Sequence, residues 1–597
     1  MCGIVGYVGS KLALPVLLGG LFSLEYRGYD SAGVVLKEQA ELCVFKRVGR
    51  INALNNWLKN KLLASSCGIG HTRWATHGEP SNNNSHPHTD ELGNVAVVHN
   101  GIIENYSELK SELTEQGIVF KSQTDTEVIA HLISLNRHLG NLEAVQAACK
   151  RLRGSYALAI VFSDEVEQII VARKDSPLVI GIGEGENFLA SDALALLPYT
   201  NTILELSNNE FAIIDSSTVT VYDKAKKIKK AKTKRLELSP ESVTKGEHPY
   251  FMLKEILEEP DSIKNTLEFL RLNDSMGKIP LHVLTEASNI HIIACGTALH
   301  AGMVLKDILE RLLRLDVFLD YASEFRYKSP KLSKNSLCIF ISQSGETADT
   351  LASLELAKEC NASTIAITNV IGSTLSNHAE YIIPTRAGPE IAVASTKAYI
   401  AQLTAIYVFA LHVAKTRGMQ LTQYSDTDIS KCARTLEELT HILDIEGVVR
   451  LISERESLYF IGRGSDYYVA LEGALKLKEI SYIHCEALPS GELKHGSLAL
   501  VEPGVVVFCL ITQKHLLEKS LNAIHEVKAR GGTIVLITQM ENINEYADIL
   551  IKLPCAPDPL MPLLAVLPLQ MLAYKTAVKK GYNPDRPRNL AKSVTVE

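Results

Sequence analysis

The residue with the clearest chemistry stands at the start of the chain, which opens Met1-Cys2-Gly3-Ile4-Val5-Gly6. We expect Met1 to be removed because the next residue is small, which leaves Cys2 with a free α-amino group beside its thiol. That amino group titrates near pH ~7.7–8.0, so it can serve as the base that activates the thiol as a nucleophile. The alternative is that Cys2 only begins a buried strand, since Gly-Ile-Val-Gly is also typical of one.

A second set of polar residues, Ser342–Thr347, follows the apolar run Leu337–Ile341 and precedes a helix expected from about Ala348. Hydroxyl and backbone N–H groups at a strand-to-helix turn form an anion cradle, and the helix dipole adds to it. The same hydroxyls could instead only cap the helix. We predict a phosphate site at this turn.

A third set, Glu472, Lys476 and Glu479, has the spacing i, i+4 and i+7. This spacing places the three side chains on one helical face within about 60°, among apolar neighbours that indicate burial. Buried sets of this kind either pair structurally or perform acid–base chemistry, and the spacing alone leaves both possibilities open. The loop Ser490–Gly496 adds His495 between two glycines.

The length and composition limit what can position these residues. A chain of 597 residues should divide into three or four domains. The net charge of -7 argues against nucleic acid or an anionic membrane as the main partner. The eight basic residues in Lys224–Arg235 favour a solvated edge or linker. We expect no membrane span and no secretory signal, and the eleven scattered cysteines favour reduced thiols in the cytoplasm.

The pattern of predicted elements changes near residue 240. The first part has short β-like runs and helices near 14–25, 104–116 and 126–138, which indicates an α+β domain with packed antiparallel sheets. Apolar strands then alternate with long helices, which is typical of parallel α/β units. The predicted strands of the first part are Cys2–Val8, Val95–Val98, Ser155–Phe162, Gln168–Ala172, Leu178–Ile182 and Glu210–Asp215.

The second part contains an internal repeat. The stretch 290–297 matches 457–465 with Gly296 aligned to Gly464, 336–342 matches 504–510, 364–367 matches 533–536, and 379–381 matches 547–549, and these alignments have an offset of 168 or 169 residues. Four matches in order predict two copies of one doubly wound α/β domain. Because the second copy lacks the Ser-x-Ser-Gly pattern, we expect one phosphate site per chain.

Nine motifs along the whole chain resemble the glucosamine-6-phosphate synthase family, the isomerising glutamine:fructose-6-phosphate amidotransferases, in its bacterial form. The motifs are CGIVG (2–6), LEYRGYDSAG (24–33), GHTRWATHGEP (70–80), HNGIIEN (99–105), SQTDTEVIAH (122–131), SQSGETADT (342–350), ASTKA (394–398), EGALKLKEISYIH (472–484) and RNLAKSVTVE (588–597).

The resemblance implies an α+β N-terminal-nucleophile (Ntn) hydrolase glutaminase domain followed by two doubly wound α/β sugar-isomerase (SIS) domains. It implies the conversion of fructose 6-phosphate and L-glutamine to glucosamine 6-phosphate and glutamate, the first step of amino-sugar synthesis. The implied segments are a glutaminase domain 2–238, a linker and lead-in helix 239–280, SIS domains 281–422 and 449–587, and a tail 588–597 that closes the sugar site.

The resemblance also assigns residues to glutamine chemistry. Cys2 would attack the glutamine amide to form a thioester, and Asn100 and Gly101 would form the oxyanion hole. The remaining residues would bind glutamine: Arg73 at its carboxylate, Asp125 at its ammonium group, and Thr76 and His77 in the pocket wall.

For the sugar, Glu479 resembles the base that moves a proton between C1 and C2, with Lys476 beside it. His495 resembles the group that opens the ring, and it could come from a neighbouring subunit of a homodimer formed through the SIS domains. Lys592 matches the lysine that forms a Schiff base, although a lysine on a terminal tail could also be solvated. The implied sugar-phosphate contacts are Cys295, Gly296, Thr297, Ser342, Gln343, Ser344, Thr347, Val393, Ser395 and Glu472.

Released ammonia would be protonated in water, so the family resemblance implies an enclosed path to the sugar, with Trp74 as its gate. We expect no cofactor. The histidines near this region (His71, His77, His86 and His88) could suggest zinc, but no cysteine or acidic residue has ligand spacing, so we expect no metal.

The chain departs from the family pattern at Ala298, Pro489 and Ser497. The linker lacks the insertion of eukaryotic relatives, so we expect no feedback inhibition by a nucleotide sugar. Two alternatives stay open. A phosphoribosyl-pyrophosphate-type amidotransferase would need a loop with paired aspartates, which we do not find. A SIS-domain sugar-phosphate sensor would have no need for Cys2, Arg73, Asp125 and Lys592 together.

Overall fold

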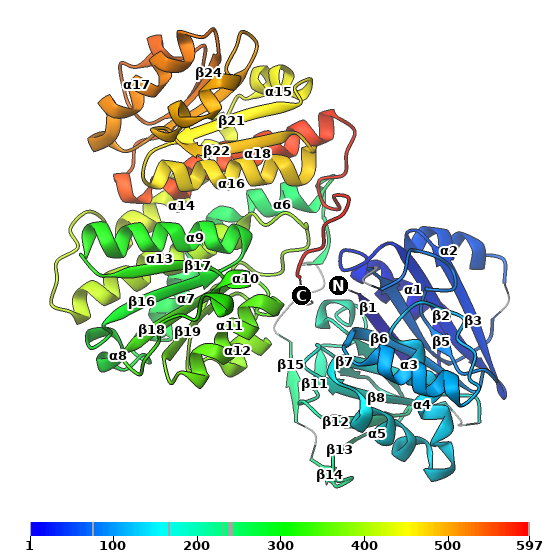
Figure 1. Cartoon of the computed structure of the whole chain (residues 1–597). Coiled ribbons are helices and arrows are strands. Elements are labelled where there is room, and N and C mark those ends of the chain that lie inside the picture. Colours follow the sequence, from blue (N-terminus) through cyan, green and yellow to red (C-terminus); the bar gives the residue numbers. More distant parts are fainter. Residues whose placement is uncertain are drawn as a thin grey trace. The chain divides into compact units, whose positions relative to one another are not determined.

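The computed structural model describes residues 2–61, 63–74, 77–164, 167–230, 232–236 and 243–594 (Figure 1). The chain divides into two compact units, one running to Thr244 and the other spanning Lys245–Lys592. Each unit builds its own sheets and its own candidate site, and the two are described separately below.

The first unit contains two antiparallel sheets that pack face to face (Figure 1). Ile4, Val98 and Ala159, from facing strands of both sheets, belong to one buried hydrophobic cluster. One sheet has the order β15 (Thr233–Arg235), β11 (Thr202–Glu205), β9 (Val179–Ile182), β10 (Glu186–Ala190), β1 (Gly3–Gly9), β4 (Cys67–Arg73), β2 (Ser31–Glu38) and β3 (Glu41–Val48). The other has the order β14 (Ile228–Lys229), β13 (Val219–Tyr222), β12 (Glu210–Ile214), β8 (Ile169–Lys174), β7 (Gly154–Phe162), β6 (Val95–Ile103) and β5 (His88–Thr89).

Helices cover the outer faces of this pair of sheets. Along β6, Ala96 and Val98 face the other sheet, whereas Val95 and Val97 pack with the helices, as the two-residue period of a strand requires. The resulting α-β-β-α layering confirms the predicted α+β class. The helices are α1 (Ala13–Leu24) on β1 and β4, α2 (Ile51–Leu58) beside β3, and α3 (Tyr106–Glu115), α4 (Glu127–Leu135) and α5 (Asn141–Arg151) on the second sheet.

All six predicted strands of this unit are present, but the sequence analysis did not identify β2, β3, β4, β5, β10 or β11. The strand β4 is fully buried and ends at Arg73, so it positions a predicted site residue. The basic segment Lys224–Arg235 supplies β14 and β15, which lie at the outer edges of the two sheets and are exposed. Lysines on an edge strand discourage pairing with another chain, in agreement with the solvated edge that the sequence predicts.

The second unit contains two parallel five-stranded sheets with one topology. The first is ordered β17 (Val317–Tyr321), β16 (Asn289–Ala294), β18 (Ser336–Ser342), β19 (Ser363–Thr368) and β20 (Tyr381–Pro384). The second is ordered β22 (His484–Pro489), β21 (Ser457–Gly462), β23 (Val506–Ile511), β24 (Thr533–Thr538) and β25 (Ile549–Lys552). Both have the doubly wound strand order 2-1-3-4-5, which confirms the repeat. In each sheet, the switch point lies between the first and third strands, and ligands of such folds bind there.

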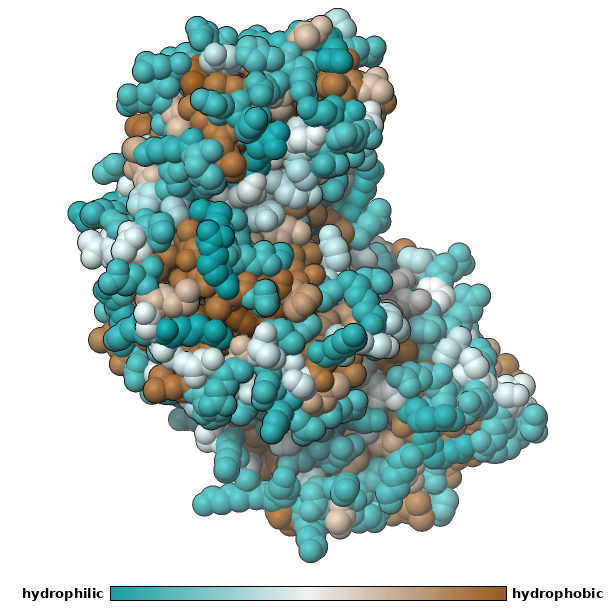
Figure 2. Space-filling model, turned by 60° about the vertical axis from the view of Figure 1, so that its left-hand side comes forward, coloured by the Kyte–Doolittle hydropathy of each residue, from teal (hydrophilic) through white to brown (hydrophobic). Residues whose placement is uncertain are grey.

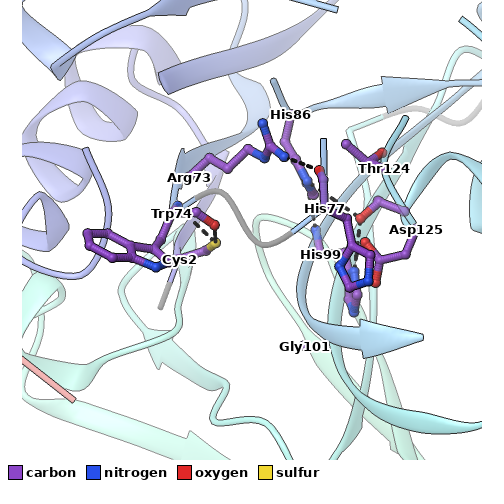
Figure 3. Close-up of a pocket in the computed structure, with 10 residues that line it drawn as sticks. Cys2, Arg73, Trp74, His77, His86, His99, Gly101, Thr124 and Asp125 are labelled. Carbon is purple, nitrogen blue, oxygen red and sulfur yellow. Dashed lines mark hydrogen bonds between the residues drawn. The ribbon is translucent and has the colours of Figure 1, made fainter. Parts of the chain in front are cut away.

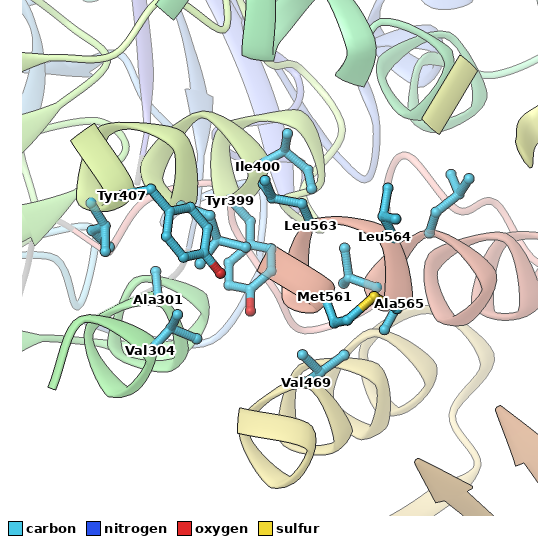
Figure 4. Close-up of a cluster of buried hydrophobic side chains, with 14 of the residues drawn as sticks. Ala301, Val304, Tyr399, Ile400, Tyr407, Val469, Met561, Leu563, Leu564 and Ala565 are labelled. Carbon is cyan, nitrogen blue, oxygen red and sulfur yellow. The ribbon is translucent and has the colours of Figure 1, made fainter. Parts of the chain in front are cut away.

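The helices of the second unit pack both copies onto one hydrophobic core. Figure 4 shows Val304 of α9, Tyr407 of α13, Val469 of α16 and Leu563 of α18 converging in this cluster. The helices are α6 (Phe251–Leu257), α7 (Glu259–Leu272), α8 (Leu281–Thr285), α9 (Gly296–Asp307), α10 (Ala322–Phe325), α11 (Ala348–Glu359), α12 (Thr374–His378), α13 (Lys397–Thr416), α14 (Asp426–Ile442), α15 (Glu446–Ser453), α16 (Ser465–Ser481), α17 (Leu517–Lys528) and α18 (Met561–Lys579).

Two helical segments of this core, Lys397–Thr416 and Asp558–Lys579, are long and apolar enough to cross a membrane by length and composition alone. Most of each segment (83% and 89%) is buried inside the unit. Burial in a shared core accounts for their apolar character. The helices α6 and α7, which fall in the predicted linker, also join this core, since α7 packs on α13 and α14.

Candidate functional site

A pocket in the first unit gathers most of the residues predicted for glutamine chemistry (Figure 3). Cys2 precedes β1, and its Sγ accepts a hydrogen bond of 3.3 Å from the backbone N–H of Trp74. Burial raises the pKa of the Cys2 thiol above its ordinary value, while the positive charge of Arg73 acts in the opposite direction. A thiol in this environment needs a base to become a nucleophile. The lining residues are Cys2, Arg73, Trp74, His77, His86, His99, Gly101, Thr124, Asp125 and Thr126.

Asn100 and Gly101 reach this pocket from β6. The side-chain Nδ2 of Asn100 donates a hydrogen bond of 2.9 Å to the backbone oxygen of Cys2. Gly101 has φ +132°, and a Cβ at this position would lie 2.1 Å from the backbone oxygen of Ser155. Only glycine therefore fits, and the strand brings an amide side chain and a glycine backbone next to the nucleophile.

Arg73 ends β4, and its buried guanidinium is held by the following loop. It donates hydrogen bonds to the backbone oxygens of His77, of Gly78 (3.0 Å) and of Glu79 (3.4 Å). Among the residues that the structure describes, no carboxylate lies within ion-pair distance of it. A buried, fixed guanidinium without an anionic partner is suited to bind a ligand carboxylate.

Asp125 lines the same pocket and is also buried. One of its oxygens accepts a hydrogen bond of 2.9 Å from the backbone N–H of Ile103, which fixes the carboxylate and leaves its other oxygen for a cation. His77 lines the pocket as well and meets the ring of Tyr106 edge-on. Thr76 lies outside the described residues.

Buried histidines form the back of this pocket. The rings of His71 and His86 stack at 4.0 Å, and His86 meets His88 edge-on at 4.8 Å. Burial lowers the pKa of His71 to about 3 and also lowers the pKa values of His86, His88 and His99, so all four rings are neutral. Within the described part of the chain, no group of three or more His, Cys, Asp or Glu residues could hold a metal ion.

The predicted phosphate loop of the second unit lies at the switch point of the first sheet, between β18 and α11. Ser342 Oγ accepts a hydrogen bond of 3.1 Å from the backbone N–H of Gly345 and lies 3.2 Å from the hydroxyl of Thr347. Gly345 has φ +66°, and a Cβ there would lie 2.1 Å from Ser373 Oγ. Gln343 and Ser344 are half-buried in the same turn. This tight turn at a helix N-terminus provides an anion cradle.

The corresponding turn of the second copy is occupied by an internal carboxylate. Asp466, in the first turn of α16, accepts hydrogen bonds from the backbone N–H of Thr512 (2.8 Å) and from its hydroxyl. Burial raises the pKa of Asp466 to about 6. The N–H and hydroxyl groups of Thr512, which would bind a phosphate in this copy, already donate hydrogen bonds to Asp466. This arrangement agrees with one phosphate site per chain.

The predicted acid–base face forms on α16, beside the loop that follows β16. Lys476 Nζ lies 3.4 Å from Glu472 Oε1 and 2.7 Å from Glu479 Oε2. Thr297 joins them, because its hydroxyl donates 3.0 Å to Glu472 and accepts 3.1 Å from Lys476. Although burial opposes it, the charges of the two carboxylates raise the pKa of Lys476, so this residue is a fixed cation. Glu479 is half-buried, with its Oε2 atom held against Lys476.

A buried ion pair that the sequence analysis missed connects the C-terminal segment to this region. Lys592 Nζ lies 2.5 Å from Glu390 Oε2, and their side chains are 5% and 0% exposed. Glu390 also accepts hydrogen bonds from the backbone N–H groups of Thr396 (2.9 Å) and Ala398 (3.0 Å) and from the hydroxyl of Ser395 (2.8 Å). Lys592 is therefore not a solvated tail residue. A glutamate directly before an apolar run was the only signal that could have indicated Glu390.

The other predicted sugar contacts are spread around these groups. Cys295 and Gly296 begin α9 at the carboxyl end of β16, and Val393 and Ser395 lie half-buried in the loop after Glu390. His495 ends a short 3₁₀ helix, is exposed, and makes no hydrogen bond or ion pair to the described acid–base residues. Of the departures from the family pattern, Ala298 is buried in α9, Pro489 ends β22, and Ser497 donates 3.4 Å to Glu486.

Comparison with known proteins adds independent findings. The model of the glutamine amidotransferase domain matches residues 71–198, and that of the SIS domain matches 283–412 and 451–580. The chain is 48% identical to the glutamine–fructose-6-phosphate aminotransferase [isomerizing] of Caldanaerobacter subterraneus and 44% identical to that of Pyrococcus horikoshii, with both chains covered in full in each case.

Two solved structures resemble the second unit. The C-terminal domain of the glucosamine-fructose-6-phosphate aminotransferase of Francisella tularensis is 38% identical, with a TM-score of 0.53, and the match covers 57% of this chain and 99% of that one. The tagatose-6-phosphate ketose/aldose isomerase of Escherichia coli is 17% identical, with a TM-score of 0.50 and coverage of 56% and 95%, and shows the fold alone.

Proposed function

Because the chain belongs to the family of isomerizing glutamine–fructose-6-phosphate aminotransferases, we propose that it converts D-fructose 6-phosphate and L-glutamine into D-glucosamine 6-phosphate and L-glutamate. The observation that carries this proposal is the presence of two different sites in one chain. One is a thiol pocket with a guanidinium that has no carboxylate partner among the described residues, and the other is a phosphate cradle in the same unit as a buried lysine.

For glutamine, Arg73 binds the carboxylate and Asp125 the ammonium group, which places the side-chain amide at Cys2 Sγ. The thiolate attacks the amide carbon, and Asn100 Nδ2 with the backbone N–H of Gly101 stabilises the oxyanion. Collapse of this intermediate releases ammonia and leaves a thioester, which water then hydrolyses to glutamate.

For the sugar, the hydroxyls and N–H groups of Ser342–Thr347 bind the phosphate. Lys592 Nζ, once its proton has passed to the paired Glu390, attacks the open-chain ketone at C2 and forms an iminium with loss of water. Ammonia adds to this iminium carbon and expels the amine of Lys592, which leaves an imine at C2. Glu479 then moves a proton from C1 to C2, while the fixed charge of Lys476 stabilises the developing oxyanion. A second subunit supplies His495 for ring opening, because within one chain this residue is exposed and makes no hydrogen bond or ion pair to the described acid–base residues.

We extend the proposal to the organisation of the enzyme. The segments are the glutaminase domain 2–238, the lead-in 239–280, SIS domains 281–422 and 449–587, and a closing tail 588–597. Ammonia travels to the sugar without entering bulk water, and Trp74 gates its path. The enzyme acts in the cytoplasm without a cofactor, and neither nucleic acid nor a membrane is a partner.

We also propose a homodimer formed through the SIS domains. The edge strand β17 exposes Phe318 (52%) and Tyr321 (55%), which are large apolar side chains at a sheet edge. Figure 2 shows that hydrophobic residues gather between hydrophilic ones on one face of the molecule. Sedimentation would test this state, and a monomer that retains full activity would contradict it.

The test of the function is the assay of both half-reactions. Purified enzyme with glutamine and fructose 6-phosphate should yield glucosamine 6-phosphate and glutamate in equal amounts. Cys2→Ala should abolish the use of glutamine and retain the isomerisation of fructose 6-phosphate, whereas Lys592→Ala should do the reverse. Full glutamine-dependent synthesis by Cys2→Ala would show that another group is the nucleophile.

A further inference from the structure

His71 lies on β4 behind the thiol pocket and is fully buried. Its Nε2 lies 3.1 Å from the backbone oxygen of His99 and 3.1 Å from Asn100 Oδ1. The mechanism above uses Asn100 as an oxyanion donor and gives His71 no part.

The contacts determine which ring nitrogen of His71 carries hydrogen. A backbone carbonyl can only accept a hydrogen bond, so the nitrogen facing the oxygen of His99 must be an N–H group. Burial lowers the pKa of His71 to about 3, so the ring is neutral and carries a single hydrogen. Consistently, the buried Nδ1 has no hydrogen-bond partner among the described residues. The ring is the Nε2–H tautomer.

This tautomer determines the orientation of the Asn100 amide. An asparagine amide can turn by half a rotation and exchange its oxygen with its nitrogen. If Asn100 turned, its NH₂ group would meet the N–H of His71, and its oxygen would face the backbone oxygen of Cys2. The N–H of His71 would keep only the backbone oxygen of His99, and the NH₂ group would lose its acceptor. The Oδ1 atom therefore stays against His71, and Nδ2 stays on the side of Cys2, where it donates 2.9 Å to the backbone oxygen.

We propose that His71 is a positioning residue of the glutaminase, and that its Nε2–H holds the Asn100 amide with its NH₂ group toward the oxyanion. The proposal rests on the proposed function, in which Asn100 stabilises the oxyanion. With the amide turned, a carbonyl oxygen would face the developing negative charge, and the donor would become a repulsive group. His86, stacked on His71 at 4.0 Å, holds the plane of the ring.

The test is a double-mutant cycle on glutamine hydrolysis with His71→Phe and Asn100→Ala. Phenylalanine keeps the ring and its stacking but removes the donor. Loss of one oxyanion donor lowers kcat by about 10²–10³-fold, so we expect a loss of this size for Asn100→Ala. His71→Phe should lower kcat by about tenfold or more, but by less than Asn100→Ala, and change KM for glutamine by less than about twofold. The double variant should be no slower than Asn100→Ala.

His71→Gln is the matched variant, because its side-chain NH₂ group can supply the missing donor and should restore most of kcat. An unchanged calorimetric unfolding transition of the first unit shows that each variant is folded, since the isomerisation of fructose 6-phosphate reports on the second unit alone. If the losses of kcat added in the double variant, or if His71→Phe changed only KM, the proposed role of His71 would be overturned. The oxyanion assignment of Asn100 would remain. Full activity of Asn100→Ala would overturn the oxyanion assignment and this proposal with it.

Discussion

Replacement of Glu390 by glutamine tests the buried ion pair that holds the C-terminal segment. The substitution keeps the size of the side chain, and its carbonyl can still accept from the N–H groups of Thr396 and Ala398. It removes the charge that faces Lys592. The ammonium group of Lys592 is then left in a site where its side chain is only 5% exposed.

The magnitude follows from the burial of both partners. Removing one partner of a buried ion pair costs about 3–5 kcal/mol. The cost cannot exceed the free energy with which the terminal segment docks, because the segment can leave its site and return Lys592 to water. At about 1.4 kcal/mol per factor of ten, the equilibrium constant between the docked and the released segment should fall by on the order of 10²–10³-fold.

Two measurements report on this population. Hydrogen exchange of the peptide that includes Lys592 should become faster in Glu390→Gln, while exchange in the core strands of both units stays unchanged. Borohydride trapping of the sugar on Lys592 should become slower at saturating fructose 6-phosphate. The double variant with Lys592→Met removes both charges and should recover slow exchange. Equal exchange in the wild type and Glu390→Gln would refute the reasoning, because the pair would then contribute nothing to docking.

Three further predictions concern single residues. Burial and the charge of Glu390 raise the pKa of Glu255 from 4.5 to about 8, so the folded chain keeps a proton that the unfolded chain releases. Stability of the second unit should therefore fall as the pH rises through that window, and Glu255→Gln should flatten this dependence in calorimetry; an unchanged slope would contradict it. Gly101→Ala should lower glutaminase kcat by at least about tenfold and leave isomerisation intact, because its Cβ would collide with Ser155; normal kcat would show that the strand adapts. Gly345→Ala should raise KM for fructose 6-phosphate by about five- to a hundredfold without affecting glutamine hydrolysis, and an unchanged KM would remove this turn from the phosphate site.

Local patterns in the sequence predicted much of this fold. The repeat could be identified because each copy preserves its strands at a constant offset, and the face of α16 could be identified because helical spacing alone brings Glu472, Lys476 and Glu479 together. The phosphate turn was predicted for the same reason, since all its groups lie within six consecutive residues.

Contacts between distant parts of the chain could not be predicted in this way. Glu390 and Lys592 are 202 residues apart, and nothing in either segment indicates that they pair. The contact of His71 with Asn100 depends on β4 and β6 lying in different, facing sheets, and β4 itself was not identified. The residue pattern of one strand predicts which of its side chains are buried. Which polar groups contact each other depends on the register of the strands and on how the sheets stack, and one strand does not encode either.

The carboxylate of Asp466 gives the two SIS copies different mechanical properties. If the turn after β18 of the first copy binds the sugar phosphate, as proposed, it gains hydrogen bonds when a substrate arrives and loses them when it departs. In the second copy, the equivalent turn is tied permanently by a side chain of the protein itself. The second copy therefore anchors the start of helix α16, on which Asp466 resides, through a contact that needs no ligand.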